Sequence, residues 1–355
     1  MGSIDSLRKT PRRRFLKALT LLFSLLGCLV LAEILLRLFL PLHFISSNEN
    51  YMYDEELGFR AKPGHSLVLK DYQQELYVNP LGTINFQRDF KDYEQLVFAL
   101  GDSYTQGTGL YSDANYPFQL DLLLNLGEDG AYRKKLGVVN LGLSAFGGEQ
   151  SLIALKRYIR LLGKPSIVLY LGCDNDYSDD LWFKSGAAHK NILEGNPYWG
   201  NWYHPVKWIF VDLEIGKRLK YLVSLKRLAT VRHAGGISPE AAREKKKETR
   251  ESPKTLAEME IEVIRRIIQT AEENGARVIL SWANPSRGYR FLKSWAKENG
   301  YPFADWVPAK ESVLQAFSSL PAGNPHSGGH YRTWVNQLIA RAYYQEIEKI
   351  QRSAE

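Results

Sequence analysis

Cysteine is scarce in this chain, which has only Cys28 and Cys173 among 355 residues. The two lie far apart and neither is part of a CxxC pair, so we expect no disulfide framework and no cysteine-ligated zinc. The sequence also lacks spaced metal ligands and a nucleotide-binding loop, and we expect no cofactor. It has no internal repeat, and its 45% apolar and 24% charged residues are typical of a globular protein.

Excess positive charge is confined to the start of the chain. The formal net charge is +7, and six basic side chains against Asp5 give the first 17 residues a net charge of +5. The other 338 residues share the remaining +2. The body is therefore nearly neutral, and its charge gives no reason to expect a nucleic-acid partner.

A long apolar run follows the basic cluster. Residues 18–32 carry no charge, and Glu33 and Arg37 stand in further apolar sequence that ends at Pro41. As one helix, residues 18–41 would be about 36 Å long, enough to cross a hydrocarbon core of about 30 Å. Glu33 and Arg37 are four residues apart, so they can pair on one helix face.

This pattern predicts a cytoplasmic tail over residues 1–14 and a transmembrane anchor over 15–42, because basic residues stay on the cytoplasmic side. The rest would lie outside the inner membrane, in the periplasm of a Gram-negative cell. A signal peptide cleaved after Val30-Leu31-Ala32 or a lipoprotein with the lipobox Leu25-Leu26-Gly27-Cys28 would also fit this region. Both leave residues 34–42 as an apolar start of the mature chain, so we favour the uncleaved anchor.

The remaining sequence predicts a short lead-in and one large α/β domain. Residues 43–94 contain turn signals and read as short strands and loops. Residues 95–350 alternate strands with helices, which is typical of a parallel sheet covered on both faces, and residues 177–256 interrupt this alternation as an insertion. The expected strands cover residues 96–100, 138–140, 166–171, 277–282 and 302–306. The expected helices cover residues 114–126, 149–162, 255–274, 287–298 and 331–350.

Polar, glycine-rich sequence follows three of the predicted strands, where parallel sheets bind ligands. Ser103 comes directly after the first strand, on a tight turn that opens a helix, which suits a nucleophile surrounded by backbone N–H groups. The second and third loops are residues 140–148 and 171–176. His326 and His330 stand just before the last predicted helix.

These four blocks, in this order, resemble the SGNH/GDSL hydrolase superfamily. The blocks are Gly101-Asp102-Ser103, the glycine-rich second loop, Asn175-Asp176 and the late histidine. Residues 53–64 and 79–86 resemble the leader of membrane-anchored bacterial members. The resemblance covers about residues 50–350 and implies a flavodoxin-like three-layer sandwich that works as a serine esterase without a cofactor.

The resemblance also implies roles for individual residues. Ser103 would be the nucleophile and His330 its general base. The oxyanion hole would comprise the Ser103 N–H, the Asn175 side chain and an N–H of the second loop. In that loop the family's glycine falls on Ala145, with Gly142 as the nearby alternative.

The sequence departs from the family at the catalytic acid, which usually stands two or three residues before the histidine. For His330 these positions are Gly328 and Ser327, and the alternative base, His326, also lacks the acid. A backbone carbonyl, Ser327 or a distant carboxylate such as Asp305 would then orient the imidazole. Asp102 is expected to be structural. Asp174 makes the third loop one residue longer than usual and has no evident role.

The insertion is rich in aromatic residues between positions 181 and 210, which suggests either a carbohydrate platform or a packed cover. The favoured function is an extracytoplasmic serine esterase acting on an O-acetylated cell-envelope or exported glycan. An O-acyltransferase would use the same residues. A catalytically weak glycan-binding protein and a lipase-like enzyme would also fit the sequence.

Overall fold

The structure is a computed structural model that describes residues 5–39, 50–69, 74–87, 89–186, 255–324 and 329–353, together with 213, 215, 216 and 218. The chain divides into two compact units. One comprises Met1–Phe44 and Trp199–Thr230, and the other Ile45–Tyr198 and Val231–Glu355. His326 and most of the aromatic segment 181–210 lie outside the described residues.

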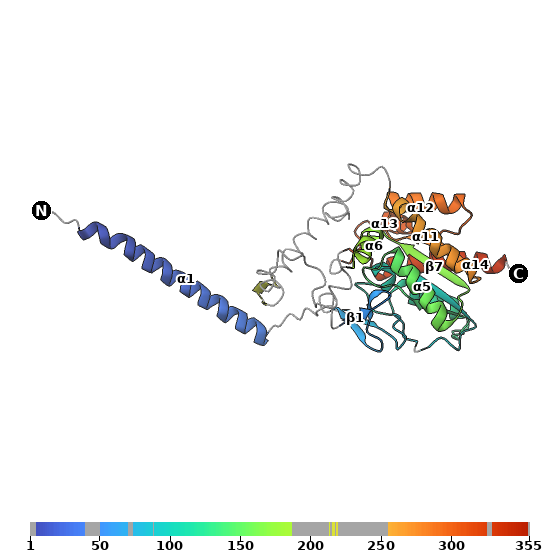
Figure 1. Ribbon diagram of the computed structural model, residues 1–355, viewed down its shortest axis with the longest axis horizontal. Helices are drawn as coiled ribbons and strands as arrows, with labels where there is room; N and C mark the ends of the chain where they lie inside the picture. Colours follow the sequence, from blue (N-terminus) through green and yellow to red (C-terminus); the bar gives the residue numbers. More distant parts are fainter. Residues whose placement is uncertain are drawn as a thin grey trace. The chain divides into compact units, whose positions relative to one another are not determined.

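The first unit contains one long helix, α1 (Asp5–Phe39), drawn in blue in Figure 1. Its part from Phe15 to Phe39 is 25 residues long with a mean hydropathy of 2.5, and in the described part of the chain it alone is long and apolar enough to span a membrane. The Arg37 Nε donates to Glu33 Oε1 at 2.7 Å, as the spacing predicts. The helix begins at Asp5, so it runs on through the basic segment expected as a tail.

The second unit begins with two antiparallel hairpins, β1 (Tyr51–Asp54) with β2 (Gly58–Ala61) and β3 (Ser66–Leu69) with β4 (Gln74–Tyr77). The Asp54 carboxylate accepts the N–H groups of the turn that follows it, and Gly58 supplies a positive φ of 80°. These are the short strands expected of the lead-in.

The main sheet has four parallel strands in the order β6-β5-β7-β8, as the alternating pattern predicts. They are β5 (Gln95–Gly101), β6 (Leu136–Asn140), β7 (Ile167–Gly172) and β8 (Arg277–Trp282). The residues of β6 and β7 are all buried, which explains their continuous apolar sequence. The expected fifth strand at 302–306 is reduced to one bridge between Leu280 and Phe303.

Helices cover both faces of this sheet and make three layers (Figure 1). On one face α4 (Tyr116–Asn125) packs against α14 (Thr333–Arg352). On the other, α11 (Leu256–Glu273) packs against both α5 (Gly148–Leu162) and α12 (Arg287–Glu298). This arrangement confirms the predicted fold class. The sequence predicts that Ser103 opens a helix, which is α3 (Ser103–Gln106), but it did not predict the helices α6 (Asp176–Lys184) and α13 (Val307–Ala316).

A second apolar cluster joins the lead-in to the sheet domain. Phe59 of β2 is buried against the rings of Phe146 and Trp182, with ring centroids 5.5 and 6.1 Å away. Gln150 at the start of α5 donates its side-chain N–H to the Leu57 carbonyl at 2.7 Å. The hairpins therefore support the loop before α5 and the helix α6, both of which carry candidate site residues.

Candidate active site

Ser103 is the first residue of α3, directly after the central strand β5. Gly101 has a φ of 147°, and a Cβ there would lie 2.6 Å from the Leu171 carbonyl oxygen, so only glycine allows this sharp turn. Asp102 caps α3, because its Oδ1 accepts the Tyr104 N–H at 2.9 Å. The turn leaves the Ser103 hydroxyl half-buried at the carboxyl end of the sheet.

The structure brings His330 to Ser103, with the imidazole Nε2 2.7 Å from the serine Oγ. The segment around the histidine is tied to the body on both sides. The Asn324 side-chain N–H donates to the Gly109 carbonyl at 2.6 Å, and the Tyr331 hydroxyl donates to the Ala283 carbonyl at 2.8 Å. The distance between His330 and Ser103 is that of a base and a serine ready for proton transfer.

The Tyr104 ring packs beside the His330 imidazole. Its ring centroid lies 4.8 Å from that of His330 at an interplanar angle of 41°, and 5.2 Å from that of Tyr331. The Tyr104 hydroxyl accepts an N–H from the Asn284 side chain, in the loop after β8. Neither Tyr104 nor Asn284 was identified from the sequence, because only the fold brings them to the histidine.

Asp102 is a carboxylate that contacts the pair. It is fully buried, and its Oδ2 accepts the Ser103 hydroxyl at 3.3 Å. Burial raises the pKa of Asp102, while the Tyr104 N–H and the nearby His330 act in the opposite direction. Asp305, the distant carboxylate suggested by the sequence, instead pairs with Lys293 at 2.5 Å and accepts the Tyr289 hydroxyl. Ser327 lies outside the described residues.

Asn175 stands at the start of α6, but its side chain does not cap that helix. Its Nδ2 donates to Asp179 Oδ2 at 2.6 Å, and the same amide lowers the pKa of Asp102. The Asn175 amide therefore lies between Asp179 and Asp102, beside Ser103. Asp179 was not predicted from the sequence, although its spacing of four residues from Asn175 places both on one helix face.

The two neighbours of Asn175 have structural partners. The Asp174 carboxylate accepts the Trp282 indole N–H and the Ser286 hydroxyl, both at 2.8 Å, and so ties the third loop to the end of β8. Asp176 is buried and accepts the Tyr170 hydroxyl at 2.9 Å. Burial and the nearby Asp102 raise the pKa of Asp176 well above its ordinary value.

The second loop contains the two backbone N–H groups that the sequence offers as oxyanion donors, those of Gly142 and Ala145. The Gly142 N–H already donates to the Asn140 side chain at 3.1 Å, and a Cβ at Gly142 would meet Thr105 at 2.5 Å. Among the described residues no acceptor is found for the Ala145 N–H, and Ala145 alone of the described non-glycine residues has a positive φ, 65°. The geometry therefore favours Ala145 over Gly142 as the donor.

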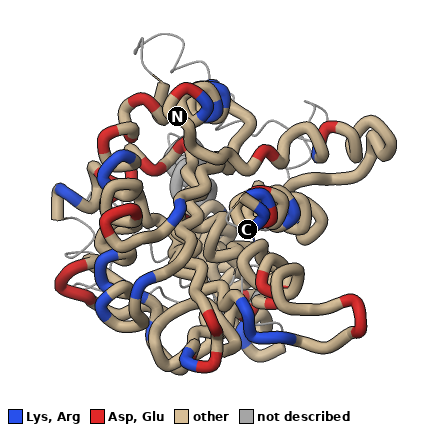
Figure 2. The backbone as a smooth tube through the Cα atoms, turned by 90° about the vertical axis from the view of Figure 1, so that its right-hand side faces the viewer, with Lys and Arg blue, Asp and Glu red and all other residues tan. Residues whose placement is uncertain are grey.

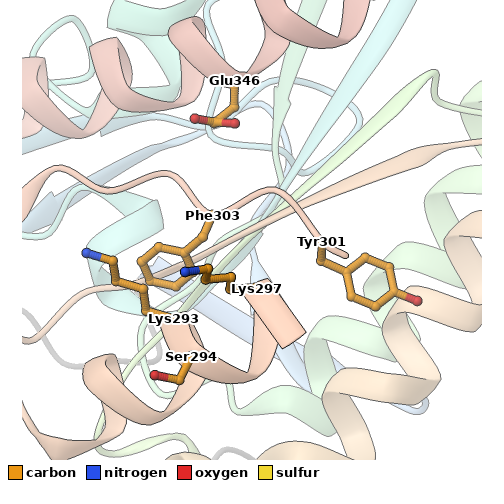
Figure 3. Close-up of a pocket in the computed structure, with 6 residues that line it drawn as sticks. All are labelled: Lys293, Ser294, Lys297, Tyr301, Phe303 and Glu346. Carbon is orange, nitrogen blue, oxygen red and sulfur yellow. The ribbon is translucent and has the colours of Figure 1, made fainter. Parts of the chain in front are cut away.

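A surface hollow of about 350 Å³ lies elsewhere, beside α12 and the end of α14 (Figure 3). Lys293, Tyr301, Phe303 and Glu346 are among its lining residues, and none of the candidate catalytic residues is.

In the described part of the chain no group of three or more His, Cys, Asp or Glu side chains is arranged to hold a metal ion. Basic and acidic residues are interspersed along the backbone in the view of Figure 2.

No protein-family model and no curated protein matches the chain. Similar solved structures are lipolytic proteins of the G-D-S-L family. One, from Desulfitobacterium hafniense, is 14% identical with a TM-score of 0.38, over 71% of this chain and 99% of that one. Another, from Veillonella parvula, is 10% identical with a TM-score of 0.38, over 70% and 96%. TesA is 14% identical with a TM-score of 0.39, over 72% and 99%.

At such identities and TM-scores the likeness does not assign a reaction. The functional proposal therefore rests on the geometry around Ser103.

Proposed function

We propose that this protein is an SGNH-type serine esterase that acts through an acyl–Ser103 intermediate. The observation that carries the proposal is the 2.7 Å contact between His330 Nε2 and Ser103 Oγ at the carboxyl end of the sheet. Asn175 and the Ala145 N–H stand on the neighbouring loops, where a parallel sheet gathers its functional groups.

In this mechanism His330 removes the Ser103 hydroxyl proton as the oxygen attacks the ester carbonyl. The N–H groups of Ser103 and Ala145 and the Asn175 amide stabilise the negative oxygen that forms. The protonated imidazole then gives its proton to the leaving alcohol. Asp102, buried beside Ser103, supplies negative charge that favours the imidazolium when it is ionised.

The test uses the full-length protein in detergent with p-nitrophenyl acetate and a fluorophosphonate probe. We expect turnover and labelling that fall by about 10³-fold or more in Ser103→Ala and in His330→Ala, because the nucleophile and base act as a unit. Ser294→Ala, at an exposed serine on α12, is the matched control and should keep both signals. Folded protein without turnover or labelling would contradict the proposal and favour a glycan-binding protein that has kept the fold.

We further propose that the ester is an O-acetyl group on a cell-envelope or exported glycan. Support comes from the apolar helix α1, which suits a single-pass inner-membrane anchor, and from the many aromatic residues of the insertion between positions 181 and 210. Acetyl esters should then be turned over far faster than long-chain esters, whereas the reverse preference would indicate a lipase. Unchanged glycan turnover in Trp199→Ala with Trp202→Ala would exclude the aromatic platform.

An O-acyltransferase is the second candidate, because the same acyl–Ser103 can pass to a sugar hydroxyl in place of water. The two are separated by mixing an acetyl donor with a glycan acceptor. Acetylated acceptor in excess of free acetate would identify the transferase.

A further inference from the structure

The Asn175 side chain has an unusual set of contacts for a residue at a helix start. Asparagine there ordinarily accepts an N–H of its own helix, but the Asn175 oxygen makes no such bond. Its amide nitrogen instead donates to Asp179 Oδ2 at 2.6 Å, one turn along α6. The local helix-capping role is therefore absent, and the amide is held by a carboxylate.

Asp179 is well placed to hold this amide in one orientation. An ionised carboxylate only accepts hydrogen bonds, so it selects the NH₂ end of the amide and not its oxygen. The nitrogen has a second hydrogen, and a hydrogen bond from the same side chain lowers the pKa of Asp102. Asp102 stands next to Ser103 in the chain, so we expect the ester oxyanion to form within reach of this amide.

We propose that Asp179 is a positioning residue that holds the Asn175 amide ready to donate to the oxyanion at Ser103. This inference rests on the proposed esterase function. Loss of Asp179 would let the amide rotate about its terminal torsion, and a misplaced donor costs much of its effect on the transition state. Asp179 itself touches no reacting atom.

The charged groups around Asp179 make its action depend on pH. Burial, together with the negative charges of Asp102 and Asp180, raises the pKa of Asp179 to about 7, against the lowering effect of Asn175. The neighbouring Asp180 interacts with Glu149 of α5, Glu260 of α11 and Lys184 of α6 itself, and Arg266 of α11 pairs with Glu149. Below pH 7 Asp179 gains a proton and becomes a weaker acceptor for the amide, so kcat should fall with it.

The test is a double-mutant cycle on the full-length protein with p-nitrophenyl acetate. We expect Asp179→Ala to lower kcat by about 10- to 100-fold with little change in KM, since the lost effect belongs to the transition state. In the Asn175→Ala background the same change should have almost no further effect, because the two residues act as one unit. Leu181→Ala, an exposed position on the same helix, is the control and should leave kcat unchanged.

A second readout is the pH profile of Asp179→Asn, which keeps an acceptor oxygen but cannot ionise. The acid limb of kcat should lose one ionisation near pH 7, and part of the activity should be kept relative to Asp179→Ala. Independent, additive effects of Asp179→Ala and Asn175→Ala, or an unchanged pH profile, would overturn the positioning role while Ser103-dependent turnover persists. Absence of any Ser103-dependent turnover would instead overturn the esterase proposal and this inference with it.

Discussion

Ala145 adopts a left-handed backbone conformation, with φ at 65°, in the loop beside the candidate nucleophile. A non-glycine residue there is strained by about 1 kcal/mol. The next residue, Phe146, is buried against Phe59, so the packing of this loop holds the strained conformation in place. Ala145 therefore combines a strained backbone with an N–H that has no acceptor among the described residues. This combination is expected of a donor that is kept for a ligand.

Replacing Ala145 with glycine should therefore raise the free energy of unfolding by about 1 kcal/mol, because glycine adopts this conformation without strain. The N–H is retained, so esterase activity should stay within a few-fold of wild type. Gly142→Ala is the contrasting variant and should destabilise the protein, since its Cβ would meet Thr105 at 2.5 Å. Denaturant titration measures the stability of both variants, and ester turnover measures their activity. A loss of stability in Ala145→Gly would show that the loop depends on the methyl group.

At the scale of single residues, the sequence predicts which residues form the candidate site but not how their side chains are oriented. Ser103 and His330 could be singled out because each stands in a short block beside a regular element, and the fold brings them within 2.7 Å. The contact of Asn175 with Asp179 could not be predicted, because an asparagine at a helix start ordinarily caps that helix. Its actual direction depends on packing and on two carboxyl groups, Asp179 of α6 and Asp102 in the turn after β5.

Two buried carboxyl groups connect α6 to α11. Burial raises the pKa of Glu260 to about 8 and that of Asp180 to about 6, and a hydrogen bond joins the two side chains. Asp180 also accepts the Glu149 N–H at the start of α5, at 2.9 Å. Near neutral pH Glu260 thus keeps its proton beside the Asp180 carboxyl group. Since the insertion leaves from α6 and returns at α11, this pair joins its two ends.

The stability of the fold should consequently fall as the pH rises. Glu260 binds its proton more tightly in the folded state than in the unfolded state, where the pKa is near its ordinary value of 4.5. The stabilisation is therefore complete below pH 4.5 and is lost as the pH rises through 8. The melting temperature of wild type should fall between pH 6 and pH 9, and Glu260→Gln should flatten this dependence.

Glu262→Gln is the matched control, because Glu262 is exposed and lies two residues along the same helix. Its melting temperatures should run parallel to those of wild type across the range. A Glu260→Gln profile as steep as that of wild type would show that the pair does not share a proton in the folded protein.

The longer elements were predictable and the short ones were not. The strand and helix pattern of residues 95–172 is strongly periodic, and the structure has these elements within a few residues of the expected bounds. The helix α13 was missed although Pro308 in its first turn is a typical start signal. Residues 302–306 were expected as a short strand, but only Phe303 pairs with β8.

In the second unit the lead-in hairpins pack against the sheet domain and form an ion pair with it. Asp54 of β1 accepts two hydrogen bonds from the Arg157 guanidinium of α5, both at 2.7 Å. This half-buried pair is bidentate, and Arg157 and the turn N–H groups lower the pKa of Asp54 against the effect of its burial. A protein that lacked residues 43–94 would expose the apolar surface around Phe146 beside the candidate oxyanion loop. The minimal active protein should therefore include the lead-in.

The whole chain makes a prediction about the membrane, because α1 carries most of its basic residues at one end, before the 25-residue segment Phe15–Phe39 of high mean hydropathy. Basic residues stay in the cytoplasm, so an intact chain should sediment with the inner membrane and expose its second unit outside the cytoplasm. We expect to find a chain of full-length mass in the membrane fraction. Protease added to spheroplasts should cleave the second unit of this chain.

The charge of the basic segment is tested by substitution. Changing Arg12, Arg13 and Arg14 together to Glu should reduce the exposure of the second unit, whereas changing the same positions to Lys should not. A mature chain that begins at Glu33 would identify a cleaved signal instead, and one that begins at a lipid-modified Cys28 would identify a lipoprotein.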